Sequence, residues 1–484
     1  MKLYRISTLV FVFALMLALV PAASAQGPAG TWVSGIACQN LDKLNAATIT
    51  LQFYQENSGT SVLDYNDTIA AGGSKNYYTP SSPPGLPAAF LGSVVVLSDT
   101  QLACNVNTQT TGNGTPANPF RIGTSAGFAE GETGMTMYAP QVMKLLAGTW
   151  TSYIAVQNAT AADVTAEVTY KDSAGNAVPA ATESFLVPGF SNHVFYQESN
   201  AGLPNGFIGA ATVTGTGNIA VVTNFYNAGL TSNDSQLHSY DGFSQGDVEL
   251  LIPRFVRRFY GYNSGMSIQN IGVNPTTVSI AFNFAGTTYN YTSPTIQPGA
   301  ALALYSKNMP ALDPVDALAM GIRFGSAKIT SNAGEPIIAI VNEDNRGLAE
   351  DNNGSPVPAE RISQGITYNA FLNGVETTTV FFAQVVAGAG GIFSGGFQVA
   401  NTTSTAASCT ATFNAQAGLT YDFALAANGS ASVYAPNVPG IVAPYNASVT
   451  VVCDQPIVGI SNLADIVGSG LVGDSFTCGN GLNQ

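Results

Sequence analysis

The sequence predicts an all-β protein in which four β-sandwich domains follow one another in an elongated array. Three observations support this. One segment recurs four times at the spacing of a whole domain, the runs between the recurrences alternate apolar and polar residues, and only 9% of the residues are charged. Alternation indicates strands with one buried face. A composition rich in Thr and Val with little charge also suits β-structure.

The first 25 residues have the pattern of a cleaved secretory signal. Lys2 and Arg5 precede an apolar run at residues 8–20, and three small residues follow at 23–25,. No later stretch has the roughly 18 consecutive apolar residues that a membrane-spanning helix needs. We therefore expect a secreted protein, extracellular or on the cell surface, with no membrane insertion after cleavage before Gln26.

The net charge argues against one class of partner. Without the signal, 13 basic residues face 29 acidic ones, a balance of −16. Binding to nucleic acid depends on neutralising phosphates with Lys and Arg. Nucleic acid is therefore excluded as an expected partner.

The recurring segment gives the domain organisation. Its strands end at Asn40, Asn158, Asn270 and Asn401, at spacings of 118, 112 and 131 residues, which suit a whole β-sandwich,. A second asparagine follows a later apolar run in each repeat, at Asn107, Asn224, Asn342 and Asn462, and a third recurring segment lies at 125–128, 239–243 and 367–371. The predicted divisions are the signal 1–25, repeat 1 at 26–134, repeat 2 at 135–246, repeat 3 at 247–374 and repeat 4 at 375–484.

Repeat 2 shows the expected strands most plainly. Seven short alternating runs are separated by turn signals at residues 172–176, 188–192 and 215–218,. Seven strands in about 100 residues is the size of an immunoglobulin-like sandwich. Only residues 313–320 compete as a helix.

The paired asparagines have two interpretations. If their strands ran the same way in opposite sheets, both would lie at one pole of each sandwich and could form a ligand surface. The alternative, which we favour, is that each asparagine ends a strand because its amide bonds the turn backbone.

The cysteines predict two disulfides. Cys38 and Cys104 occupy positions where repeats 2 and 3 carry apolar residues, so both should point inward and bond across the core. Cys409 and Cys453 fall within repeat 4 and are the second expected pair,. Cys478 is left over as a buried free thiol, a competitor for one of these pairs, or an intermolecular link.

The sequence offers little catalytic chemistry. The segment 123–127 matches a Gly-x-Ser-x-Gly nucleophile elbow around Ser125, but no helix follows it, as that motif requires,. Only two histidines exist, His193 and His238. We expect no enzyme and no catalytic residues, and calcium is the one cofactor that the sequence leaves open.

Weak signals point to calcium and to sugars. The loop 342–355 gathers Glu343, Asp344, Glu350 and Asp351, oxygen donors of the kind that calcium takes, although a solvated loop is the simpler reading,. Exposure of Tyr77 and Tyr78 on one sheet face would favour sugar binding. The basic, aromatic stretch 254–263 is better explained as a core strand.

Repeats 2 to 4 each open with a strand, at 138–145, 250–258 and 380–386, whereas repeat 1 reaches Trp32 directly after the signal. We therefore expect repeat 1 to lack its first strand, or repeat 4 its last. Either way one sheet edge should be unpaired, as a site for strand addition by another chain or, the alternative we favour, as a truncated but capped edge.

The pattern "YAPQVMK…W…IAVQN…VTAEVTYKDSAGN…IAVVTN…SYDGF" resembles the tandem immunoglobulin-like repeats of secreted bacterial surface proteins. The resemblance spans nearly all of 27–480 and is weakest in repeat 4. It implies a non-enzymatic stalk, coat, filament or adhesive protein, and nine Asn-x-Ser/Thr sites would allow glycosylation. The alternative is an extracellular carbohydrate-binding protein assisted by calcium. Expected partners are other copies of the chain, other cell-surface proteins, or extracellular glycans.

Overall fold

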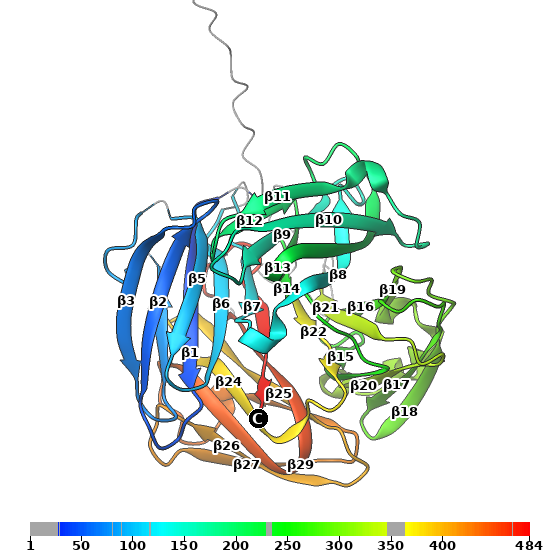
Figure 1. Cartoon of the computed structure of the whole chain (residues 1–484). Coiled ribbons are helices and arrows are strands. Elements are labelled where there is room, and N and C mark those ends of the chain that lie inside the picture. Colours follow the sequence, from blue (N-terminus) through cyan, green and yellow to red (C-terminus); the bar gives the residue numbers. More distant parts are fainter. Residues whose placement is uncertain are drawn as a thin grey trace, which may run out of the picture.

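The computed structural model describes residues 28–484 apart from 29, 80, 89, 116–117, 229–234, 346–363 and 467. Strands dominate this part of the chain, and its helices are short 3-10 turns (Figure 1). The prediction of an all-β protein is confirmed. Within the described residues, no helix is long and apolar enough to cross a membrane.

Repeat 1 forms two sheets, one of order β4-β1-β6-β7 and one of order β3-β2-β5. All neighbouring strands in both sheets are antiparallel. The strands are β1 (Trp32–Asn40), β2 (Ala47–Gln55), β3 (Ser61–Ile69), β4 (Ser74–Tyr78), β5 (Gly92–Ser98), β6 (Leu102–Thr110) and β7 (Ile122–Ala126).

Repeat 2 has an additional first strand, β8, which pairs with β13. The long strand β13 runs through both sheets of this repeat, pairing with β10 and β8 in its first half and with β9 and β14 in its second. The strands are β8 (Gly134–Lys144), β9 (Trp150–Asn158), β10 (Val164–Asp172), β11 (Glu183–Val187), β12 (Asn192–Tyr196), β13 (Phe207–Asn227) and β14 (Leu237–Asp241), with 3-10 turns η1 (Glu130–Glu132) and η2 (Pro179–Ala181).

Repeat 3 forms sheets of order β19-β16-β21-β22 and β18-β17-β20-β15-β23. The expected helix at 313–320 is a 3-10 segment that starts at Pro310. The elements are β15 (Glu249–Val256), β16 (Asn263–Asn270), β17 (Val278–Phe284), β18 (Thr287–Thr292), β19 (Ala301–Tyr305), η4 (Ser306–Asn308), η5 (Pro310–Ala317), η6 (Met320–Ile322), β20 (Phe324–Ser331), β21 (Ile337–Asp344), β22 (Gly365–Asn369) and β23 (Phe371–Leu372).

Repeat 4 follows the plan of repeat 2, with a long strand β29 shared by its two halves. A two-residue strand, β31, covers the outer edge of β24. The elements are β24 (Thr377–Ala387), β25 (Phe393–Asn401), β26 (Ala407–Phe413), β27 (Thr420–Leu425), β28 (Ser430–Tyr434), η8 (Ala435–Asn437), β29 (Tyr445–Asp465), β30 (Thr477–Asn480) and β31 (Leu482–Asn483).

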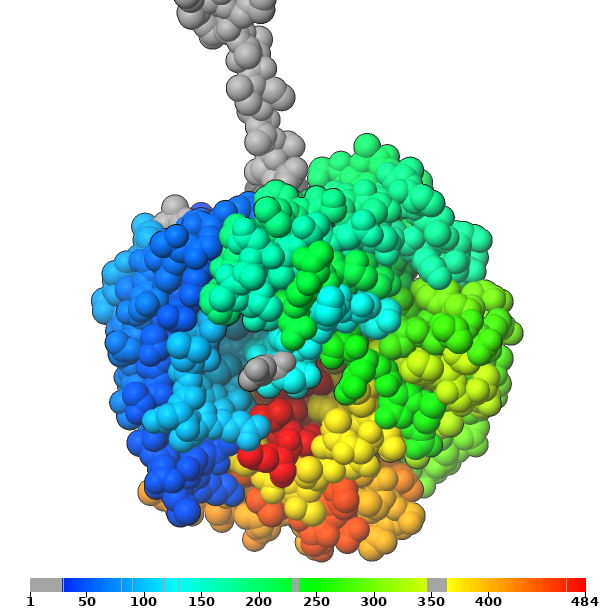
Figure 2. Space-filling model, viewed as in Figure 1, coloured from blue at the N-terminus to red at the C-terminus, as the bar shows by residue number. Residues whose placement is uncertain are grey.

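The prediction of an elongated array is wrong, because the four repeats close into a ring (Figures 1 and 2). Equivalent places join each repeat to the next. The four junctions are Asn57 N–H to the Asn192 carbonyl (3.0 Å), Lys171 Nζ to the Pro298 carbonyl (2.9 Å), Ser326 Oγ to the Asn428 carbonyl (2.6 Å) and, closing the ring, Ser448 N–H to Ser74 Oγ (2.9 Å).

The strands of the third recurring segment explain why the chain closes. These are β7, β14 and β22, and β30 takes the same place in repeat 4; we call the four the central strands. Each pairs with its own sheet on one side and contacts the next central strand around the axis. Ser239, Tyr240 and Thr367 on these strands are at most 4% exposed. A linear array would leave these side chains in water.

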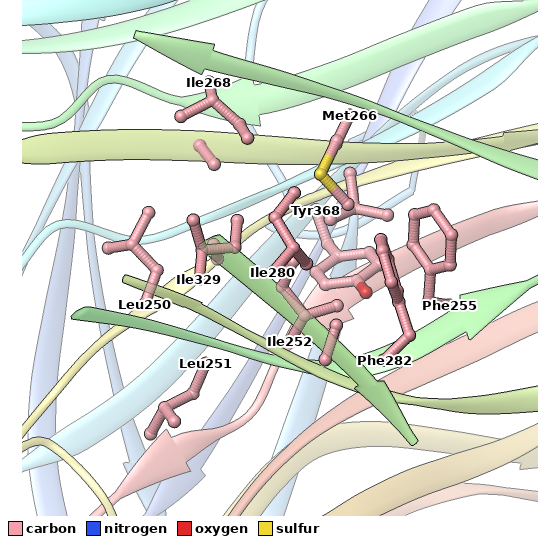
Figure 3. Packing of buried hydrophobic residues seen from close by; sticks show 14 of the residues in the cluster. Leu250, Leu251, Ile252, Phe255, Met266, Ile268, Ile280, Phe282, Ile329 and Tyr368 are labelled. Carbon is pink, nitrogen blue, oxygen red and sulfur yellow. The ribbon is translucent and has the colours of Figure 1, made fainter. Parts of the chain in front are cut away.

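Each repeat surrounds an apolar core, and some cores take in side chains from a neighbouring repeat. The core of repeat 3 is built from side chains of its two sheets, among them Ile268, Ile280, Phe282 and Ile329 (Figure 3). It also takes in Val458 and other residues from repeat 4, so neighbouring cores are not separate. The core of repeat 1 is the smallest of the four, with eight buried members against 20 in repeat 4.

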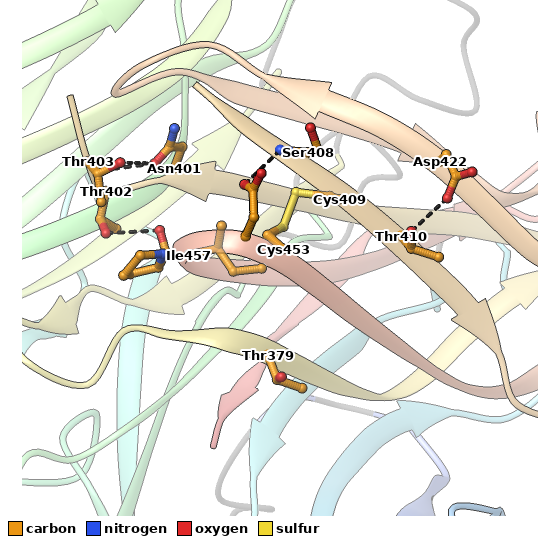
Figure 4. Close-up of a disulfide and its surroundings, with 12 residues drawn as sticks. Thr379, Asn401, Thr402, Thr403, Ser408, Cys409, Thr410, Asp422, Cys453 and Ile457 are labelled. Atoms are coloured by element: carbon orange, nitrogen blue, oxygen red, sulfur yellow. Dashed lines mark hydrogen bonds between the residues drawn. A yellow bond between two sulfur atoms is a disulfide. The ribbon is translucent and has the colours of Figure 1, made fainter. Parts of the chain in front are cut away.

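The structure contains the disulfides Cys38–Cys104 and Cys409–Cys453, the second of which is shown in Figure 4. The expectation that the first bond crosses the core is wrong. Both bonds join residues directly opposite each other on neighbouring strands of one sheet, with Cα atoms 4.1 Å apart. Such a short separation is typical of a cross-strand pair that is not hydrogen-bonded.

Cys478 is the free thiol among the described residues, and it is 3% exposed in β30. Its Sγ donates to the Thr367 carbonyl at 3.3 Å, and burial raises the pKa of the thiol. Of the three roles considered for Cys478, the structure favours the buried thiol.

We predict that Cys478 does not react with Ellman's reagent in the native protein, because the thiolate is the reactive form and burial suppresses it. Denaturant without reductant should release one reactive thiol per chain. A Thr68→Cys variant, with its cysteine on an exposed strand position, serves as the reactive control. Rapid labelling of Cys478 in the folded wild-type protein would contradict this burial.

Candidate functional site

The first landmark asparagines serve the fold. In each repeat the side-chain oxygen accepts from the backbone N–H two residues further on, and the amide nitrogen donates to carbonyls of two different turns. For Asn401, shown in Figure 4, the N–H belongs to Thr403 (3.0 Å) and the carbonyls to Thr405 and Ala426 (2.6 and 3.1 Å). Equivalent bonds hold Asn40, Asn158 and Asn270. The turn interpretation is confirmed.

The second landmark asparagines point toward the axis. The oxygens of Asn107, Asn224 and Asn342 each accept from a hydroxyl on the central strand of the same repeat, Thr124 (2.6 Å), Ser239 (2.5 Å) and Thr367 (2.8 Å). In repeat 4 the residue opposite Asn462 is Cys478, which has no hydroxyl, and the preceding residue, Thr477, donates to Thr124 of repeat 1 at 2.8 Å. Because the two strands of each asparagine pair are antiparallel neighbours in one sheet, the shared-pole hypothesis is wrong.

Side chains also join the central strands to one another. The backbone N–H groups of Ala126, Asp241 and Asn369 donate to the side-chain oxygens of Asp241, Asn369 and Asn480, at 3.0, 3.1 and 3.2 Å. The amides of Asn369 and Asn480 donate back to the carbonyls of Asp241 and Asn369. The four strands are thus linked in the order β7, β14, β22 and β30 without a continuous backbone ladder.

Asp474 closes the other end of the axis. Its carboxylate, 0% exposed, accepts from the N–H groups of Leu237, Gly365 and Phe476 at 3.0–3.2 Å. Burial raises the pKa of Asp474, while the three donors and the nearby Arg121 charge act in the opposite direction. The residue therefore fixes the starts of β14, β22 and β30 relative to one another.

The first strands of repeats 2 to 4, β8, β15 and β24, lie at the junctions between repeats, and we call them the opening strands. Each has a bulge at the same place, at Pro140–Gln141, Pro253–Arg254 and Ala383–Gln384. Gln141 accepts from Asn342 in repeat 3 (3.0 Å), and Gln384 accepts from Asn107 in repeat 1 (2.7 Å). In repeats 2 and 4 the bulge side chain therefore bonds the landmark asparagine of the next repeat.

Arg254 forms the most buried ion pair at these junctions. Its Nε and Nη2 donate to the two Glu343 oxygens, both at 2.6 Å, and its Nη1 donates to Gln398 at 2.8 Å. Burial by itself disfavours the charged form of Arg254, but the Glu343 carboxylate offsets this and raises the pKa of Arg254 above its ordinary value. The Tyr368 hydroxyl donates to the Arg254 carbonyl.

The predicted calcium residues are only partly brought together. Both carboxylate oxygens of Glu343, in strand β21, accept hydrogen bonds from Arg254. Asp344 follows Glu343 at the end of the strand. Glu350 and Asp351 lie outside the described residues, so calcium binding by this loop stays a prediction. In the part of the chain that the structure describes, no three His, Cys, Asp or Glu residues are grouped to hold a metal.

The other candidates lie on strands β4, β7, β12 and β14. Tyr77 is 2% exposed and Tyr78 43%, so they point to opposite faces and do not form an exposed aromatic pair. Ser125 lies within strand β7. His193 stacks on Phe185. The Nδ1 atom of His238 forms a hydrogen bond with the Thr367 hydroxyl across the axis (2.8 Å).

One cavity at the axis, among the described residues, is very small. A cavity of about 10 Å³ lies between repeats 4 and 1, lined by Asn107, Thr124, Gln384 and Asn462 among others. Such a volume is near the limit for a single water molecule. The arrangement at this place can tie the repeats together but cannot admit a substrate.

The bulges and the axis carboxylates were not identified as important from sequence. A signal was available: residues 137–142, 250–255 and 380–385 share the pattern apolar, any, apolar, Pro or Ala, Gln or Arg, apolar. Asp241 and Asp474 lack such a signal, because no acidic residue recurs at their positions in every repeat.

Asp241 predicts a pH dependence of stability. Burial raises the pKa of Asp241 from 3.8 to about 7, and the Glu132 charge adds to this. The native state then holds a proton that the unfolded chain releases, so this contribution is greatest below about pH 4 and is lost as the pH rises through about 7. We expect urea unfolding of Asp241→Asn to lack this part of the decline. Repeat 3 already carries Asn369 at the equivalent position. A difference between wild type and variant that is constant from pH 4 to 8 would contradict the assignment.

Together, the fold and the axis define an all-β protein of four sequence repeats closed around buried polar contacts. No protein-family model matches the chain, and no curated protein matches it.

Two solved structures give weak likenesses. A tetra-tandem repeat from the extending region of a large adhesion protein is 11% identical, covers 94% of this chain and 95% of its own, and has a TM-score of 0.11. A triple jelly roll from the turret assembly of an archaeal virus is 11% identical, covers 79% and 88%, and has a TM-score of 0.14. At these scores neither likeness supports an argument about this protein.

Proposed function

We propose that the chain is a non-enzymatic structural or adhesive protein that works outside the cell. The observation that carries this proposal is that the recurring polar side chains form hydrogen bonds within the protein itself. Both asparagine landmarks and the bulge side chains that recur from repeat to repeat bond the turns, the axis or the next repeat. What the repeats offer to partners is therefore their outer surface.

The outer faces suit contact with other molecules in water. Their strands present hydroxyl and amide side chains, as in the cross-strand pair Thr50–Asn66 (2.7 Å). Two disulfides are typical of proteins in oxidising compartments outside the cytoplasm. With the signal-like start, they support secretion, and the proposed partners are surface proteins or further copies of this chain.

The proposal is tested by imaging and by binding. Purified native protein, viewed by electron microscopy, should appear as compact rings, alone or joined in regular assemblies, and should adsorb to the envelope of the producing cells. Panels of chromogenic esters and glycosides should show no turnover. Turnover that follows the purified ring, or a protein that stays free of all envelope material, would contradict the proposal.

Carbohydrate binding is the second candidate, and one surface favours it. A shallow hollow of about 230 Å³ on the outer sheet of repeat 3 is lined by Asn290, Tyr291, Thr292, Lys328 and Thr330 among others. An aromatic ring beside amide, hydroxyl and ammonium groups suits a sugar. A glycan array read with wild type and with Asn290→Ala, with and without calcium, discriminates this function from the first.

A further inference from the structure

Strand β5 of repeat 1 has an unpaired edge. It pairs with β2 and, among the described residues, with no other strand. The equivalent strands of the other repeats, the first half of β13, β20 and the first half of β29, each pair on both sides. In those three repeats the second neighbour is the opening strand.

The register shows which backbone groups of β5 are free. The Leu91 carbonyl accepts from the Glu56 N–H, just after β2, and the Asp99 N–H donates to the Thr48 carbonyl in β2, so Leu91 and Asp99 turn these groups away from the open edge. Antiparallel pairing alternates, so Ser93, Val95 and Leu97 also bond β2, and Val94 and Val96 turn their N–H and C=O groups to the open edge. Val94 and Val96 are partly exposed, whereas their counterparts Ala211 and Val213 are at most 1% exposed.

The edge carries none of the features that usually prevent pairing. Its sequence, GSVVVLS, contains no charge and no proline, and Leu97 is 50% exposed. Natural edge strands are commonly protected by lysine, proline or a bulge. A seven-residue uncharged edge without them is suited to receive another strand.

The filled repeats define the strand that would fit. Each opening strand contributes the pattern apolar, any, apolar, Pro or Ala, Gln or Arg, apolar, and its apolar members Ala139, Ile252 and Phe382 are at most 1% exposed. The bulge follows directly after these residues, opposite the same two positions of the partner strand. In β5 the equivalent positions are Val94 and Gly92. This alignment uses the aromatic residue opposite the first position on the neighbouring strand, which is Phe53 in repeat 1 and Tyr170, Phe282 and Phe413 in the others.

Two neighbours of the edge can be compared with the filled junctions. Tyr240 and Tyr368 donate their hydroxyl hydrogens to the bulge carbonyls of repeats 2 and 3. The equivalent position is Ser125 in repeat 1 and Gly479 in repeat 4, whose junction is filled, so a tyrosine is not required to hold an opening strand. The turn of Phe190 lies against Ser93, but an equivalent contact, Lys171 to Pro298, lies beside the filled junction of repeat 2. The contact between Ser93 and the turn of Phe190 is therefore compatible with a strand inserted beside β5.

We propose that the open edge of β5 binds an extended segment of another protein, antiparallel to β5, whose sequence follows the pattern of the opening strands. The partner is a different protein because the described segments of this chain with that pattern are already paired. The inference rests on the proposed structural or adhesive role, for which it names the contact and the class of partner. Main-chain hydrogen bonds would supply affinity and the apolar pockets specificity.

The probe is a fluorescent peptide with the sequence of residues 134–144, GMTMYAPQVMK, added to the intact mature protein. We expect saturable binding by fluorescence anisotropy, with slower hydrogen exchange at Val94 and Val96. Tyr138 bonds Phe243 on the outer side of β8, so the nitrogens of Met137 and Ala139 face the partner strand. A peptide N-methylated at these two nitrogens should bind at least tenfold more weakly.

A pair of protein variants locates the binding. Val96→Pro removes an N–H that faces the open edge and should abolish binding, whereas Val95→Thr, whose N–H already bonds β2, should bind as wild type. If Val96→Pro fails to fold, the N-methylated peptide still decides. No binding, or binding indifferent to N-methylation, would overturn the inference. Intact adsorption to cell envelopes in the same preparation would show that the proposed function survives without it.

Discussion

A chain that ends at residue 374, without repeat 4, should not fold into three stable repeats. The truncated chain loses the hydrogen bond from Thr477 to Thr124 and the bonds that the starts of β14 and β22 donate to Asp474. It also loses the repeat 4 side chains that complete the core of repeat 3. Polar groups at the axis would then face water or lack partners. We expect aggregated material in size-exclusion chromatography and no sharp thermal transition by circular dichroism.

The control for this truncation is removal of Gln484 alone, which is exposed and should leave the melting curve unchanged. An elongated array predicts the opposite result. In that arrangement the remaining repeats would keep their melting temperature, because each would depend only on its sequence neighbour. A monomeric truncated chain with native-like melting would therefore contradict the ring.

Replacing Arg254 by alanine should destabilise the protein by about 3–5 kcal/mol, because it leaves the Glu343 carboxylate buried without its partner. Arg254 is 5% exposed and Glu343 1%. The loss would appear as a lower midpoint in urea unfolding at neutral pH.

Two controls separate the buried charge from lost packing. The double variant R254M/E343L removes both charges and should recover most of the stability, since apolar replacements of buried pairs are often neutral. Lys328→Ala breaks the exposed pair Lys328–Glu249 (2.7 Å) and should cost under about 1 kcal/mol,. Equal losses for Arg254→Ala and Lys328→Ala would show that burial does not govern the Arg254 pair.

Local chemistry made part of the fold predictable. Asn158 bonds the N–H of Thr160, two residues away, so its role can be inferred from the strand end alone. The pair Cys38–Cys104 follows from aligning both cysteines with apolar positions in repeats 2 and 3, and Cys409–Cys453 from the place of both within repeat 4. Neither inference needs to know how the repeats are arranged.

The closure could not be predicted in this way. Thr367 and Ser239 read as polar residues on an alternating strand, and alternation alone indicates solvent on their side. Their partners come from other strands around the axis, over 100 residues away in some cases, as in the bond between His238 and Thr367. Glu343 was misleading for the same reason: in the sequence it stands beside acidic neighbours, but Arg254, its partner, is 89 residues distant.

The bond between Thr124 and Thr477 spans 353 residues, which constrains how the newly made chain acquires its shape. Ribosomes add about 5–20 residues per second, so the β7 strand waits about 20–70 s for its last neighbour to be synthesised. During that interval the growing polypeptide exposes strands that pair readily with other chains. Passage through an export channel in an extended state, with maturation only after release, would spare the cell this exposed intermediate.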